Sequence, residues 1–247
     1  MNRLSILAAV ALAAAPACGQ AQDSAYRFET KVIQLPAGAR PHDAAPGRPG
    51  EIWYTAQRQG ALGIVDIDAW SYRQVPLGEG SSPHGVVLGP DGIDDTPDGE
   101  IWYVSLAGSH LAKVDRADGS IEVIEPPHEN AQLRRVWADS QGELWITGWN
   151  SGKLYRYRPA SAEWTTFDLP GEKPQAYAVY VDARDDVWVT DFASNNTLVF
   201  DIATEKWIAT IPGSGPNAQV RQILGRGDEV YLPESGTDRL MLVTVGG

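Results

Sequence analysis

The stretch GEIWYTA, residues 50–56, decides the fold because the chain repeats it four more times. The related segments are GEIWYVS (99–105), GELWITG (142–148), DVWVTD (186–191) and EVYLPE (229–234). Their aromatic residues, here called the anchors, are Trp53, Trp102, Trp145, Trp188 and Tyr231. The anchors are 49, 43, 43 and 43 residues apart, and the duplicated stretch PDGIDDTPDG (90–99) explains the longer first interval. A fixed period of just over 40 residues indicates a repeat architecture.

Each repeat has the pattern of four short strands. In the second repeat these are HGVVLG, EIWYVS, HLAKVDR and SIEVIEP, in which apolar and polar residues alternate. Asp-Gly pairs at 91–92, 98–99 and 118–119 are typical of the turns between paired strands. Four-stranded units at this period predict an all-β propeller with five blades, whose tryptophan anchors pack between the blades.

The two ends of the chain predict how the propeller closes. After the last anchor there is one more strand, DRLMLVTV (238–245), while FETKVIQLP (28–36) resembles the fourth strands of the other repeats. We therefore expect the N-terminal strand to complete the last blade and close the ring, because pairing would cover two sheet edges. Residues 22–247 then form a single domain.

Residues 1–21 have the features of a secretory signal. Arg3 precedes an apolar run that is too short to span a bilayer, and small residues follow it. Cleavage after Ala21 and lipid attachment at Cys18, in the lipobox-like stretch APACGQ, both fit the sequence. We expect an exported protein, either periplasmic or a membrane-anchored lipoprotein, with no transmembrane segment in the mature chain.

Composition excludes several classes of function. With 20 basic and 32 acidic residues the formal net charge is −12, so the surface repels nucleic acid. Cys18 is the single cysteine, so the folded domain has neither a disulfide nor a thiolate metal site. The sequence also has no phosphate-binding loop, no Gly-x-Ser-x-Gly elbow and no His-Glu-x-x-His segment.

The repeat predicts which polar residues meet at one end of the central channel. Eleven residues before each anchor, allowing for the insertion, lie His42, His84, Arg134, Tyr177 and Val220. Three residues after each anchor lie Ala56, Ser105, Gly148, Asp191 and Glu234. The polar members of both sets form a predicted funnel. They are His42, His84, Arg134, Tyr177, Asp191 and Glu234.

Each funnel residue has a functional and a structural interpretation. The two histidines suit a base near neutral pH, or they are solvated residues of the rim. Arg134 binds an anionic group or neutralises a carboxylate, and Tyr177 contacts a ligand or packs at the rim. Asp191 and Glu234 are weak candidates for a cation site, since a carboxylate in such a place more often accepts hydrogen bonds from loop amides.

The repeated core PHxx…GxIWxT resembles the virginiamycin B lyase (streptogramin lyase) family. It occurs in RPHDAAPGRPGEIWYT (40–55) and in SPHGVVLGPDG (82–92), followed by AKVD (112–115). Members of that family open a cyclic depsipeptide by elimination across its ester bond. The resemblance implies that His42 meets the substrate and that His84 is the base. The family has seven blades and binds magnesium through acidic residues, which are not matched at Ser82 and Ser105.

The sequence thus leaves two functions from different classes. One is a carbon-oxygen lyase that opens an ester or depsipeptide, with His84 as base, His42 orienting the substrate, and Arg134 or Tyr177 donating to the carbonyl oxygen. The other is a non-catalytic propeller that binds a small ester or peptide ligand or a protein partner. A metal-dependent lactonase is a weaker third, because such propellers need a central acidic metal site.

Overall fold

The computed structural model describes residues 31–246 except 48, 79, 89–100 and 116–117. The chain divides into two units, Met1–Val32 and Ile33–Gly247. The expected signal at 1–21, with Cys18 and Ala21, and most of the duplicated insertion at 90–99 lie outside the described residues. Within the described ranges, no helix is both long and apolar enough to cross a membrane.

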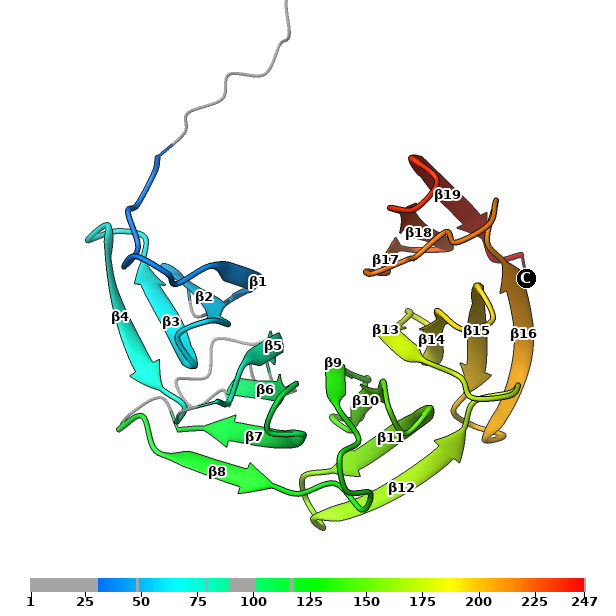
Figure 1. Ribbon diagram of the computed structural model, residues 1–247, viewed down its shortest axis with the longest axis horizontal. Helices are drawn as coiled ribbons and strands as arrows, with labels where there is room; N and C mark the ends of the chain where they lie inside the picture. The colour runs from blue at the N-terminus through cyan, green and yellow to red at the C-terminus, as the bar shows by residue number, and fades with distance from the viewer. Residues whose placement is uncertain (1–30, 48, 79, 89–100, 116–117, 247) are drawn as a thin grey trace, which may run out of the picture. The chain divides into compact units, whose positions relative to one another are not determined.

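The second unit is a five-bladed β-propeller, which confirms the predicted fold class (Figure 1). The first blade comprises β1 (Pro41–Pro46), β2 (Glu51–Ala56), β3 (Ala61–Asp66) and β4 (Ser71–Pro76). The second comprises β5 (Pro83–Leu88), β6 (Ile101–Ser105), β7 (His110–Val114) and β8 (Ile121–Ile124). The third comprises β9 (Leu133–Ala138), β10 (Leu144–Gly148), β11 (Lys153–Arg158) and β12 (Glu163–Asp168).

The last two blades follow the same plan. The fourth comprises β13 (Ala176–Val181), β14 (Asp186–Asp191), β15 (Asn196–Asp201) and β16 (Lys206–Pro212). The fifth comprises β17 (Leu224–Arg226), β18 (Glu229–Glu234) and β19 (Arg239–Thr244). Every sheet is antiparallel with its strands in chain order, so the first strand of each blade is an edge strand.

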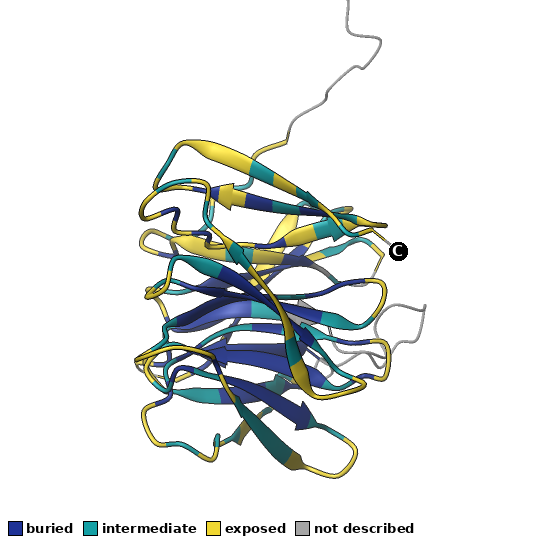
Figure 2. Ribbon diagram, turned by 90° about the vertical axis from the view of Figure 1, so that its right-hand side faces the viewer, coloured by how far each residue is buried: buried dark blue, intermediate teal, exposed yellow. Residues whose placement is uncertain are grey.

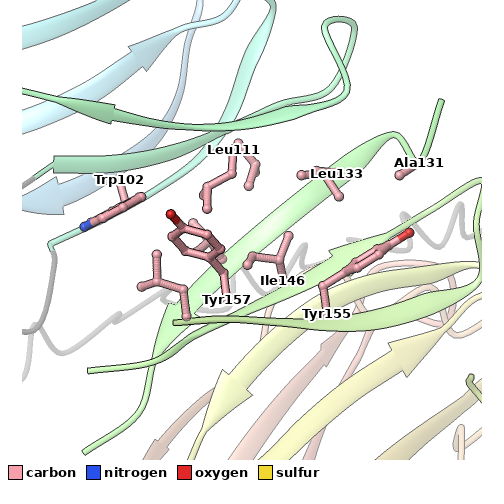
Figure 3. Packing of buried hydrophobic residues seen from close by; sticks show 10 residues of the cluster. Trp102, Leu111, Ala131, Leu133, Ile146, Tyr155 and Tyr157 are labelled. Atoms are coloured by element: carbon pink, nitrogen blue, oxygen red, sulfur yellow. The ribbon is translucent and has the colours of Figure 1, made fainter. Parts of the chain in front are cut away.

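The tryptophan anchors lie in the apolar layers between blades, as the sequence predicts. Trp53, Trp102, Trp145 and Trp188 are all at most 2% exposed. Figure 3 shows Trp102 of the second blade facing Tyr157 of the third, with ring centroids 5.8 Å apart. In Figure 2 the inner strands of the blades are mostly buried, whereas exposed residues lie in the turns and along outermost strands such as β12 and β16. Inter-blade burial of these side chains is therefore the main apolar contribution to the fold.

Two anchors donate their indole N–H to an aspartate that directly follows the preceding strand. Trp145 Nε1 donates to Asp139 Oδ2 at 2.8 Å, and Trp188 Nε1 donates to Asp182 Oδ2 at 3.0 Å. The other oxygen of each carboxylate accepts hydrogen bonds from turn amides. A buried indole N–H without a partner would be costly, so these pairs stabilise the blades.

The last blade differs from the prediction that the N-terminal strand completes it. Its sheet has three strands, and the described residues 31–36 belong to no strand. Ile33 and Leu35 instead pack against the first blade, beside Tyr54 and Ala61. The apolar residues of this segment therefore contact the first blade without strand pairing. Residues 28–30 of the expected strand lie outside the described part of the chain.

Candidate functional site

Four of the predicted funnel residues form one cluster. His42, His84, Arg134 and Tyr177 are each the second residue of a first strand, β1, β5, β9 and β13. The imidazole centroids of His42 and His84 are 4.2 Å apart, and that of His84 lies 6.0 Å from the Tyr177 ring. The guanidinium carbon of Arg134 lies 4.5 Å from the Tyr177 centroid. The repeat thus brings together residues from four blades, here called the mouth cluster.

A β-bulge at each of these positions frees the side chains from the regular pairing. The register between first and second strands shifts between Pro41 and Ala44, between Pro83 and Val86, and at the same place in the next two blades. A bulge leaves residues unpaired and bends the strand, which is why bulges often re-aim side chains at functional sites.

Threonine hydroxyls fill the bulges and connect successive blades. Thr55 Oγ1 accepts a hydrogen bond from Asp43 N at 3.0 Å and donates to the His84 carbonyl at 3.2 Å. Thr147 makes the equivalent bonds to Arg135 N and the Tyr177 carbonyl, and Thr190 to Ala178 N and the Val220 carbonyl. The threonine of the GxIWxT motif therefore fixes the backbone of the next blade's mouth residue.

Gly85, which follows His84, permits a close approach between the second and third blades. A Cβ atom at this position would lie 3.1 Å from the Arg134 carbonyl oxygen and 3.2 Å from Arg135 Cα. Such contacts with backbone atoms cannot be relieved by a rotamer change. The glycine of the Pro-His-Gly stretch thus allows His84 to lie against the first strand of the third blade.

His84 is buried, in contrast to the solvated rim position considered from the sequence. It is 2% exposed, and its Nδ1 has no hydrogen-bond partner among the described residues. Burial lowers the pKa of His84 to about 3, and the neighbouring His42 and Arg134 act in the same direction. The imidazole is therefore neutral at pH 7, with a weakly basic ring.

His42 is the more accessible histidine and has a carboxylate partner. Its side chain is 33% exposed, and His42 Nδ1 lies 2.8 Å from Asp43 Oδ1. A carboxylate can only accept, so Nδ1 carries the hydrogen and Nε2 has the lone pair. Partial burial lowers the pKa of His42, followed by the charges of Arg135 and Arg134. His42 is thus held in the neutral form with a fixed tautomer.

Arg135 connects three blades through the centre of the propeller. One of its terminal nitrogens pairs with the second carboxylate oxygen of Asp43, and the other donates to the Arg221 carbonyl at 3.4 Å. Asp43 and Arg135 also line a cavity of about 70 Å³ together with Ala178 and Gln222. The chain of contacts from Arg135 through Asp43 to His42 therefore holds the exposed histidine in place.

Two aromatic residues extend the mouth cluster. Trp149 and Phe192 lie four residues after the anchors of the third and fourth blades. The Arg134 guanidinium lies 4.5 Å from the Trp149 centroid, and Phe192 stacks on Tyr177 at 4.7 Å with an angle of 11°. Both were missed from the sequence, where the position three after the anchor was considered. The same repeat, read one residue later, identifies them.

Asp191 and Glu234 have structural roles in the loops. Asp191 accepts hydrogen bonds from the amides of Gln175, Ala193 and Ser194 at 2.7–3.2 Å. Glu234 accepts from the Ser214 amide at 2.7 Å and from two hydroxyl groups. Burial raises the pKa of Glu234, but the Ser214 and Thr237 hydrogen bonds outweigh it and hold this pKa below its usual value. Both carboxylates thus cap loops.

The residues present do not fit the magnesium site that the family resemblance implies. Ser105 Oγ donates to the Ser81 carbonyl and accepts from the Gly108 amide, so it fills the same structural role as Asp191. Among the described residues, no group of three or more histidine, cysteine or acidic side chains could hold a metal ion. With the oxygens of Asp43, Asp191 and Glu234 already engaged, no metal-assisted step is derived for this site.

Comparison with known proteins shows the fold. No family model and no curated protein matches the sequence. Virginiamycin B lyase from Staphylococcus aureus is similar in structure, with a TM-score of 0.74 and 18% identity, over 87% of this chain and 73% of that chain. A catalytically inactive histidine-to-alanine variant of that lyase, solved with quinupristin, gives the same values.

Propellers of other kinds are similar as well. The extracellular domain of a Bacteroides thetaiotaomicron protein, described as a one-component system, has a TM-score of 0.68 at 14% identity, over 90% of this chain and 29% of that chain. A Bacteroides caccae protein of unknown function has a TM-score of 0.63 at 14% identity, over 86% of this chain and 80% of that chain. At these identities the shared feature is the propeller fold.

Proposed function

We propose that the protein is a carbon-oxygen lyase that opens an ester or depsipeptide by elimination at the mouth cluster. The observation that carries the proposal is the contact between two neutral histidines, His42 and His84, at 4.2 Å beside Arg134 and Tyr177. A base must be unprotonated to act, and the lowered pKa values keep both imidazoles in that form at neutral pH.

The chemistry needs a base at the carbon next to a carbonyl group and a hydrogen-bond donor to the carbonyl oxygen. The base removes the proton next to a carbonyl group, a carbon-carbon double bond forms, and the carbon-oxygen bond breaks to release a carboxylate. Negative charge develops on the carbonyl oxygen, where a donor lowers the barrier. Tyr177 and Arg134 are the donors that the cluster offers.

His42 is better placed than His84 to be the base. Its side chain is 33% exposed, and Asp43 fixes its tautomer so that Nε2 has the lone pair. His84 is 2% exposed, and a pKa of about 3 makes it a weak base. We therefore propose the reverse of the roles suggested by the family resemblance, with His42 as base and His84 as the residue that supports it.

A screen of cyclic depsipeptides, including quinupristin, and of simple esters that carry the ester oxygen on the carbon β to a second carbonyl group tests the reaction. Elimination within a cyclic depsipeptide gives a linear product of unchanged mass, whereas hydrolysis adds the mass of one water. With a substrate in hand, His42→Ala should reduce kcat/KM on the order of 10²- to 10⁴-fold, which is the usual cost of losing a positioned base. Turnover that survives both His42→Ala and His84→Ala excludes the histidine mechanism.

A non-catalytic binding propeller is the second candidate. The low basicity of the buried His84 favours it, and one of the similar structures is an extracellular domain of a one-component system. In this case the mouth cluster holds a small ligand or a protein partner without transforming it. A ligand that binds, is recovered unchanged and is lost in His42→Ala would support this function over the lyase.

Export from the cytoplasm remains a proposal that rests on the sequence of residues 1–21. Mass spectrometry of the mature protein from cells tests it. A chain that begins at Gln22 supports ordinary cleavage, and a chain that begins at a lipid-modified Cys18 supports the lipoprotein. An intact N-terminus would exclude export.

A further inference from the structure

Cations without a carboxylate partner gather at the mouth cluster of an acidic protein. The chain has a formal net charge of −12, yet Arg134 and Arg221 form no ion pair with any of the described residues. The nearby carboxylate of Asp43 is already engaged, because one oxygen contacts His42 and the other pairs with Arg135. Two guanidinium groups therefore remain without a neutralising anion.

Arg134 packs against two aromatic rings and has a buried nitrogen without a partner among the described residues. Its guanidinium carbon lies 4.5 Å from the centroids of both Trp149 and Tyr177, which are nearly perpendicular at 86°. Its Nε atom is buried and has no partner among the described residues. A guanidinium that packs against aromatic rings spends none of its N–H groups on them, so these groups can donate to a carboxylate.

The aromatic residues continue from Arg134 to Arg221. Tyr177 stacks on Phe192 at 4.7 Å, Trp149 lies 5.4 Å from Phe192, and the Arg221 guanidinium carbon lies 5.6 Å from the Phe192 centroid. Trp149 and Phe192 are both partly exposed. An apolar platform therefore connects the two cationic groups, and its Tyr177 ring lies 6.0 Å from the His84 ring.

We propose that the mouth cluster binds an organic carboxylate with an adjoining aromatic or other flat apolar group. Arg134 holds the carboxylate, Arg221 adds to the positive field, and the rings of Trp149 and Phe192 contact the apolar part. This proposal rests on the proposed function, because it names the class of ligand that binds at the same site. If the substrate carboxylate occupies Arg134, Tyr177 is the donor to the reacting carbonyl group.

Binding of N-acetylphenylalanine, compared with its neutral carboxamide, tests the proposal by calorimetry or Trp fluorescence. The acid should bind about tenfold more tightly than the amide, which corresponds to one charge-assisted contact of about 1.4 kcal/mol. Binding of the acid should weaken as salt is added, since ions screen exposed charges. Equal binding of the two compounds, or no saturable binding of the acid, would overturn the proposal.

Matched arginine variants locate the site. Arg134→Gln should remove the preference for the acid, and Arg221→Gln should weaken acid binding several-fold. Arg73→Gln, on the exposed outer strand β4, is the control and should bind the acid like the unchanged protein. Acid binding in both Arg134→Gln and Arg221→Gln that is as strong as in the unchanged protein would overturn the proposal. If Arg134→Gln does not fold, as judged by its melting curve, Arg221→Gln and the salt dependence decide.

The outcome is independent of the lyase proposal because no turnover is measured. Acid-selective binding without turnover of any ester would contradict the lyase proposal and support the proposed class of ligand. Turnover of esters by elimination, together with equal binding of the acid and the amide, would support the lyase proposal and contradict the proposed class of ligand.

Discussion

Two sets of residues recur at the same end of the blades, yet they do different things. At the starts of the first strands, His42 lies beside His84, His84 beside Tyr177, and Tyr177 beside Arg134. At the ends of the second strands, Ser105, Asp191 and Glu234 accept hydrogen bonds from loop amides. The repeat period thus determines where a residue lies, whereas its immediate partners determine whether it is free to act on a ligand.

The largest effect on stability is expected from a loop cap. Asp191→Ala removes a buried acceptor of three backbone amides and leaves those donors unsatisfied, which should cost about 3 kcal/mol of unfolding free energy. Urea denaturation measures the loss, and Asp228→Ala, whose side chain is 77% exposed, is the control. An unchanged unfolding midpoint in Asp191→Ala would show that this carboxylate is available for another role.

The buried histidine should make the fold sensitive to acid. The pKa of His84 is lowered from 6.5 to about 3 in the folded state, so the unfolded chain binds the proton first as the pH falls. The stability associated with neutral His84 is complete above pH 6.5 and is lost progressively as the pH falls towards 3. At pH 5 the loss should be about 2 kcal/mol.

The variant His84→Phe isolates this contribution, because other groups also titrate in acid. Its unfolding free energy should fall less steeply below pH 6.5 than that of the unchanged protein. The exposed His42, replaced by Gln, is the matched control and should leave most of the pH dependence in place. Parallel pH profiles for His84→Phe and the unchanged protein would show that His84 is not buried in its neutral form.

A smaller loss of stability is expected from removing a threonine hydroxyl that connects two blades. Thr190→Val keeps the shape of the side chain but removes the bonds to Ala178 N and the Val220 carbonyl. The loss should be about 1–2 kcal/mol, because two buried backbone groups lose this partner while the side-chain packing is kept. Thr210→Val, on the exposed strand β16, is the control in the same denaturation experiment. Equal stability of the two variants would mean that the threonine bridge contributes nothing.

Much of this organisation could be predicted from the sequence. The anchor period gave the five blades, the burial of the tryptophans and the four residues of the mouth cluster. The burial of His84 could not be predicted, because it depends on how closely Gly85 lets the third blade approach. The N-terminal strand was expected from its resemblance to the fourth strands, yet Ile33 and Leu35 pack on the first blade outside any strand.

The contacts that the mouth residues make with residues of other blades could not be predicted from the repeat pattern either. Asp43 follows His42 directly, but its bond to Arg135 joins residues that are 92 positions apart. Such a bond depends on the relative placement of the first and third blades. Trp149 and Phe192 were visible in the repeat, and their role becomes clear from their contacts with Arg134 and Tyr177.

A crystal structure of the protein with N-acetylphenylalanine tests most directly the claim that the first-strand ends form the functional site. We predict that the carboxylate lies within hydrogen-bonding distance of the Arg134 guanidinium and that the phenyl ring contacts Trp149 or Phe192. Asp191 and Glu234 should keep their bonds to the loop amides in the same structure. A ligand bound elsewhere, or a mouth cluster that stays free of ligand at saturating concentration, would contradict the account.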